Sequence, residues 1–133
     1  MRLVSITLLL ISLALPLKAG PKEDVKSVIS QQIESFKRDD FGAAFEFASN
    51  SIRSIFRTPE NFGRMVRQGY PMVWRPRSVT FLSFDKLGEG YTQDIEVIDQ
   101  NGIAHYLRYY MISTNLGWRI NGVEMLKGNP LAV

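Results

Sequence analysis

The residues best placed to do chemistry are one arginine, one glutamate and two tyrosines: Arg108, Glu124, Tyr106 and Tyr110. Tyr106, Arg108 and Tyr110 alternate along one segment, so in an extended strand their side chains share one face of a sheet. An arginine can bind an anionic ligand, and tyrosines can supply the walls and hydroxyl donors of a pocket. These four residues are therefore the candidate ligand-binding residues. The interpretation that we favour for Arg108 and Glu124 is a cross-strand ion pair that is satisfied within the sheet.

The other polar residues do not indicate a catalytic or metal site. The chain has one histidine, His105, and no cysteine, so a zinc site would need carboxylates that no spacing brings together. Asp94 and Glu96 alternate with Ile95 and Val97, which is the ordinary pattern of a solvated strand face. We expect no catalytic residue, no metal and no cofactor.

Four strands must position these side chains. Alternating apolar residues predict an antiparallel meander, with strands at about 77–86, 91–99, 103–114 and 118–126. A two-residue Asn-Gly turn at 101–102 would pair Ile95 with Arg108, and a three-residue turn at 115–117 would pair Thr114 with Trp118 and bring Glu124 opposite Arg108.

This register divides the strands into two faces. The face richer in aromatic and branched residues is expected to lie against the helices: Ile95, Val97, Tyr106, Arg108, Tyr110, Ile112, Trp118, Ile120 and Glu124. The face expected to point away includes Asp94, Glu96, His105, Leu107, Tyr109 and Met111. A one-residue bulge would exchange the two faces.

Three helices are predicted before the sheet, at about 22–38, 41–48 and 59–69. The first has an apolar stripe at spacings of three and four from Val25 to Phe36. Thr58 followed by Pro59 is a strong start signal for the third helix. The predicted fold class is therefore α+β, with three N-terminal helices packed on a curved four-stranded antiparallel meander, a cone-like fold.

The stretch "MVRQGYPMVWRPRSVTF" (65–81) connects the last predicted helix to the first strand. Pro71 and Pro76 oppose helix continuation, and Trp74 could bury its ring where helices and sheet meet. The alternative is a basic and aromatic binding surface, because residues 53–77 hold six arginines against Glu60 alone. We interpret the stretch as a joint, with Tyr70 and Trp74 as its structural junction residues.

Residues 1–19 are predicted to be a secretory signal peptide, leaving a single domain at 20–133. Arg2 precedes an apolar run, Pro16 breaks it, and Ala19 is a small residue before the cut. Without Arg2 and Lys18 the formal net charge of +3 falls to +1, which argues against nucleic-acid binding. We expect an exported protein, periplasmic or secreted, with no stable membrane anchor once the signal is removed.

Two quoted stretches resemble a known family. "FEFASNSIRSIFRTPENFGRMVRQGYPMVWRPRSVTF" (45–81) and "GWRINGV" (117–123) are similar to a bacterial family of small exported proteins, domain-of-unknown-function family 4864. The order of helices and strands resembles the nuclear-transport-factor-2-like superfamily, which includes steroid isomerases and polyketide cyclases. The resemblance implies a cone-like fold and assigns no activity.

We expect a non-enzymatic binding or accessory module whose partner is an unknown small molecule or protein. One alternative is a pocket enzyme, an isomerase or hydro-lyase acting on a small apolar acid. Another is a homodimeric scaffold joined through the outer sheet face, where His105, Tyr109 and Met111 are expected to lie.

Overall fold

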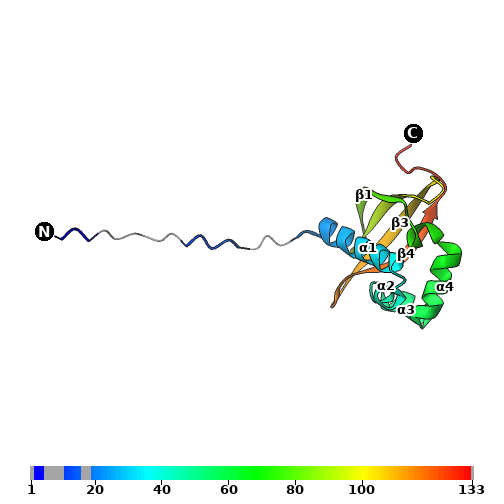
Figure 1. Cartoon of the computed structure of the whole chain (residues 1–133), viewed down its shortest axis with the longest axis horizontal. Helices are drawn as coiled ribbons and strands as arrows, with labels where there is room; N and C mark the ends of the chain where they lie inside the picture. The colour runs from blue at the N-terminus through cyan, green and yellow to red at the C-terminus, as the bar shows by residue number, and fades with distance from the viewer. Residues whose placement is uncertain (1, 5–10, 16–18, 133) are drawn as a thin grey trace.

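The computed structural model describes residues 2–4, 11–15 and 19–132. In this part of the chain, helices come first and strands follow (Figure 1). The helices are α1 (Pro21–Lys37), α2 (Phe41–Glu46), α3 (Asn50–Phe56), α4 (Pro59–Gly69) and α5 (Pro71–Trp74). The strands are β1 (Ser78–Leu87), β2 (Gly90–Ile98), β3 (Ala104–Thr114) and β4 (Gly117–Leu126). The predicted α+β fold class is confirmed, and α3 and α5 are two short helices beyond the three predicted.

The predicted signal segment, residues 1–19, lies partly outside the described residues. Its described leucines and isoleucine are exposed and make no part of the core: Leu3, Ile11, Leu13 and Leu15. Among the described residues, no helix has both the length and the apolar character needed to cross a membrane.

Three of the helices begin at residues whose side chains cap them. The Asp40 carboxylate accepts from the Ala43 amide at 3.0 Å at the start of α2. The Thr58 hydroxyl accepts from the Asn61 amide at 3.1 Å at the start of α4, as the Thr58-Pro59 signal predicts. A third cap, Ser49, starts α3 and accepts from the Ile52 amide at 3.3 Å. These caps satisfy amides that have no partner within the helix.

The strands form a sheet in the order β1-β2-β3-β4, all antiparallel. The predicted register between β2 and β3 is wrong by one residue: Ile95 lies opposite Leu107, and Arg108 lies opposite Asp94. The reason is Asp99, whose carboxylate accepts from the amides of Asn101 and Ile103. This side chain organises a loop over 99–103 in place of a two-residue turn.

The register between β3 and β4 contains two deviations that cancel. The turn has two residues, pairing Thr114 with Gly117 and not with Trp118 as predicted. A bulge then places Asn121 as an extra residue on β4, so that Glu124 does lie opposite Arg108, as predicted. The backbone pairing of these two residues is therefore confirmed, although the predicted turn is wrong.

The helices cover one face of the sheet, and the core lies between the two layers (Figure 1). From α1 the predicted stripe of Val25, Ile29, Ile33 and Phe36 is buried. From the sheet the core takes six residues: Ile95, Val97, Leu107, Tyr109, Met111 and Ile120. Leu107, Tyr109 and Met111 were expected on the outer face, and that expectation is wrong because the one-residue change in register exchanges the faces of β3.

Candidate functional site

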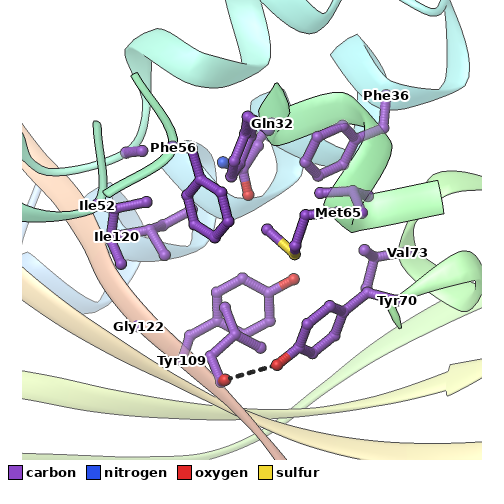
Figure 2. Close-up of a pocket in the computed structure, with 14 residues that line it drawn as sticks. Gln32, Phe36, Ile52, Phe56, Met65, Tyr70, Val73, Tyr109, Ile120 and Gly122 are labelled. Atoms are coloured by element: carbon purple, nitrogen blue, oxygen red, sulfur yellow. Dashed lines mark hydrogen bonds between the residues drawn. The ribbon is translucent and has the colours of Figure 1, made fainter. Parts of the chain in front are cut away.

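An apolar cavity of about 230 Å³ lies between the helices and the inner face of the sheet (Figure 2). Its walls come from helices α1, α3, α4 and α5, from Ala48 between α2 and α3, from Tyr70 between α4 and α5, and from strands β3 and β4. The fourteen lining residues are all uncharged: Gln32, Phe36, Ala48, Ile52, Phe56, Phe62, Met65, Val66, Tyr70, Val73, Tyr109, Ile120, Gly122 and Val123. Such a space favours an uncharged, mainly apolar occupant, because burying an unpaired charge costs several kcal/mol.

The bulge at Asn121 shapes the β4 wall of this cavity. Because one residue is added there, Ile120 and Val123 both point inward, although they are three positions apart. The Asn121 amide oxygen accepts from the Ser49 hydroxyl at 2.8 Å, and the Ile120 carbonyl accepts from the Ser49 amide at 2.8 Å. The start of α3 is therefore fixed against β4, which places Ile52 at the cavity wall.

Gln32 supplies one polar group to the cavity. It lies on the apolar stripe of α1 and is 3% exposed. Its amide nitrogen donates to the Ala44 carbonyl at 3.1 Å, and its amide oxygen points into the cavity (Figure 2). The reverse orientation would set oxygen against oxygen at Ala44, so the hydrogen bond determines which atom the cavity presents.

Two tyrosine hydroxyls supply the remaining polar atoms. The Tyr70 hydroxyl donates to the Val123 carbonyl at 3.2 Å, so it offers only lone pairs to an occupant. The Tyr109 side chain is 1% exposed, and its hydroxyl opens onto the cavity without a hydrogen bond to any of the other lining residues (Figure 2). Burial raises the pKa of the Tyr109 hydroxyl above its ordinary value of 10.0, and the nearby Tyr70 adds to the shift. Tyr109 therefore keeps its proton at physiological pH and can donate it.

The four residues predicted to bind a ligand do not line this cavity. The side chains of Tyr106, Arg108 and Tyr110 lie on the sheet face away from the helices, because β3 has the opposite orientation from the predicted one. Glu124 lies opposite Arg108 on β4 and is exposed. The predicted inner placement of these residues is wrong, and their ligand-binding role stays a prediction without support from the cavity.

Arg108 forms its ion pair with Asp94 and not with Glu124. Its guanidinium donates twice to the Asp94 carboxylate, at 2.8 and 3.0 Å. The Asp94 side chain is only 4% exposed, whereas that of Arg108 is 35% exposed. Beside this pair the Tyr106 hydroxyl donates to Glu96 at 2.9 Å. The outer face is therefore polar and largely satisfied by its own cross-strand partners.

The stretch 65–81 links the helices to the sheet. Tyr70 reaches β4 through Val123, and the Trp74 indole donates to the Asp39 carboxylate at 2.8 Å. Arg75 stacks on the Trp74 ring and donates twice to Asp39, at 2.9 and 3.0 Å. The Trp74 hydrogen bond and the Arg75 guanidinium hold the pKa of Asp39 below its ordinary value of 3.8. Both aromatic rings are half-buried against the core.

His105 lies at the opposite end of β3 from its turn with β4. Its Nε2 atom is 2.8 Å from the Asp99 carboxylate, and this contact lowers the pKa of Asp99, as do the loop amides. His105 pairs with Val97, so it lies on the inner face and not on the outer face as expected. No group of three or more metal-ligating side chains occurs among the described residues.

Gln32 and Tyr109 are the cavity residues that the sequence interpretation missed. Gln32 falls between Ile29 and Phe36 on the buried stripe of α1, and a polar residue in such a position is a signal for an internal hydrogen bond. Tyr109 alternates with Leu107 and Met111, which marks an apolar strand face once the correct register is known.

The fold and the cavity together define a small α+β cone with an internal apolar pocket. The chain belongs to the family described as "Domain of unknown function (DUF4864)", whose model matches residues 18–133. A search of curated proteins gave no match. Among solved structures, the chain is similar to an NTF-2 like protein of unknown function from Shewanella oneidensis MR-1. The TM-score is 0.57 at 10% identity, with 80% of this chain and 98% of that chain covered, so the likeness concerns the fold.

Proposed function

We propose that this protein is an exported, non-enzymatic binding module that holds a small, uncharged, mainly apolar molecule in its cone. The observation that carries the proposal is the 230 Å³ cavity walled by uncharged side chains. An apolar cavity of about 150 Å³ is already enough to hold benzene. The cavity here has room for a substituted aromatic ring or a molecule of similar size.

The non-enzymatic part of the proposal rests on the groups that reach the cavity. Its polar atoms belong to Gln32, Tyr70 and Tyr109, and the raised pKa of Tyr109 makes that hydroxyl a poor base at neutral pH. An acid–base enzyme acting on an apolar acid would place separated carboxyl or imidazole groups at the substrate. The lining supports binding more directly than turnover.

Export is supported by the order of residues in 1–19 and by the exposure of the described apolar residues there. A mature chain beginning near Gly20 in the periplasm or medium is the expected product. Intact-mass measurement of extracytoplasmic protein tests this directly. Recovery of material that retains Met1 would contradict it.

Binding is tested with 4-ethyltoluene, a hydrocarbon probe that makes no hydrogen bond. Calorimetric titration and thermal unfolding should show binding, with stabilisation of about 2.7 kcal/mol when the free probe is at a hundred times its Kd. Val123→Phe is the matched test variant, because it places a larger ring against the cavity wall. Ile112→Phe is its control, since Ile112 pairs with Arg119 and is absent from the lining. Equal binding by wild type and Val123→Phe would contradict the proposed site.

A further inference from the structure

Three side-chain polar atoms at the cavity wall differ in the hydrogen bonds that they can still make to an occupant. The Gln32 amide oxygen can only accept a hydrogen bond, since the amide nitrogen is committed to Ala44. The Tyr70 oxygen can only accept as well, since its proton is directed at the Val123 carbonyl. The Tyr109 hydroxyl makes no hydrogen bond to the other lining residues, so both its proton and its lone pairs face the cavity. The cavity therefore offers one donor and several acceptors.

We infer that the occupant carries a single neutral hydroxyl group on an apolar body, as a phenol or a small alcohol does. A hydroxyl group both accepts and donates hydrogen bonds. It can accept a hydrogen bond from the Tyr109 hydroxyl and donate one to the Gln32 or Tyr70 oxygen. A hydrocarbon would leave the Tyr109 hydroxyl buried without a partner, which is costly. An ether or ketone would satisfy Tyr109 and leave the acceptors unused.

Anionic ligands fit this cavity poorly. No lining residue is a cation. The arginine that was predicted to bind a ligand, Arg108, lies on the other face of the sheet and pairs with Asp94. A carboxylate would be desolvated without a counter-charge. Because the lining holds no cation, the cavity should bind a neutral phenol more tightly than a benzoate.

This inference rests on the proposed function, and a matched probe series separates the two. The probes are 4-ethyltoluene, 4-ethylanisole, 4-ethylphenol and 4-ethylbenzoate, which share one ring and one ethyl group and differ in the para substituent. Calorimetry on the mature wild-type protein should give the tightest binding for 4-ethylphenol. We expect roughly a tenfold advantage over 4-ethyltoluene, with 4-ethylanisole between them and 4-ethylbenzoate weakest.

Tyr109→Phe locates the preference within the cavity. It should reduce the advantage of 4-ethylphenol over 4-ethyltoluene to less than about threefold, partly by strengthening 4-ethyltoluene binding, because the hydrocarbon then leaves no buried hydroxyl unpaired. Tyr110→Phe is the matched control, because Tyr110 is the next residue along β3 and lies on the outer face, opposite Thr92 and Gly122. It should keep the full tenfold advantage.

The outcomes that overturn the inference are distinct from those that overturn the proposed function. If 4-ethyltoluene binds as tightly as 4-ethylphenol, the hydroxyl preference is refuted and the apolar binding function stands. If the preference survives Tyr109→Phe and disappears in Tyr110→Phe, the group that recognises the probe hydroxyl lies on the outer face, and the inference is refuted too. If no probe binds the wild-type protein, both proposals fail together.

Discussion

The polar side chains on the two faces of the sheet differ in whether they have hydrogen-bond partners within the chain. On the outer face Tyr106 donates to Glu96, and Arg108 binds Asp94 with two hydrogen bonds. On the inner face Tyr109, only three residues from Tyr106, is buried and has a hydroxyl open to a cavity. The outer face is satisfied from within the chain, whereas the inner face keeps a polar group uncommitted. Uncommitted polarity inside an apolar space is a stronger indication of a ligand than paired charge on a surface.

The largest difference between the faces should appear when neighbouring residues on β2 are truncated. Ile95 is fully buried on the inner face, and Glu96 is half-buried on the outer face. Ile95→Ala should lower the free energy of unfolding by about 3 kcal/mol through lost burial and a new void. Glu96→Ala should cost about 1 kcal/mol or less, the value of one partly exposed hydrogen bond. Urea denaturation of both variants measures this, and equal losses would contradict the assignment of faces.

The next largest effect concerns the ion pair on the outer face. Arg108→Met leaves the Asp94 carboxylate, only 4% exposed, without its partner. We expect a loss of about 2 kcal/mol, below the usual range for a fully buried pair because the arginine is partly solvated. Adding Asp94→Leu should recover much of this loss, while adding Glu124→Leu should recover little. Recovery with Glu124→Leu and not with Asp94→Leu would restore the pairing predicted from the sequence.

A smaller, pH-dependent effect is expected at the joint between helices and sheet. Asp39 has a positive φ of 56°, which asparagine also tolerates, so Asp39→Asn removes the charge with little backbone strain. Because folding lowers the pKa of Asp39, its contribution to stability is present above the ordinary value of 3.8 and is lost as pH falls through the lower folded value. The variant should have a lower Tm than wild type at neutral pH, and the two should converge below pH 3.8. A Tm difference that stays constant down to pH 2 would show that the charge of Asp39 is not involved.

The smallest expected effect on stability compares two tyrosines of β3. Tyr109→Phe removes a hydroxyl that makes no hydrogen bond to the other cavity-lining residues, so the free energy of unfolding should change by less than about 0.5 kcal/mol. Tyr106→Phe removes the hydrogen bond to Glu96 and should cost about 1 kcal/mol. Chemical denaturation without added ligand ranks the two, and a larger loss for Tyr109→Phe would mean that its hydroxyl has a partner within the protein.

The elements and the inner face of β2 could be predicted from the sequence, and the faces of β3 could not. Alternation located each strand to within about a residue, and the Thr58-Pro59 signal marked the start of α4. The β2–β3 register failed because the Asn-Gly pair was taken as the turn, while the Asp99 side chain organises a longer loop. The extra residue of the bulge, Asn121, contacts Ser49, which is 72 residues away in the chain. Contacts at that separation leave no local pattern.

The candidate site depended on these same details. One residue of register decides whether Arg108 or Tyr109 faces the helices, so the predicted ligand group was placed on the wrong face. Gln32 could be located on the α1 stripe from sequence, but the identity of its partner, Ala44, could not. An internal space forms only where the packing of several elements is incomplete, and no single segment encodes it.

Methyl-resolved NMR with 4-ethylphenol tests the central claim, that a small molecule occupies the inner face of the sheet. Met65, Ile120 and Val123 report on the cavity, while Ile98 and Ile112 report on the outer face. We predict that titration shifts the first group progressively toward saturation and leaves the second group unchanged. Intermolecular contacts should join the ring protons of the probe to the Met65 and Val123 methyl groups. Shifts confined to Ile98 and Ile112, or no saturable shift at any of the five residues, would contradict the account.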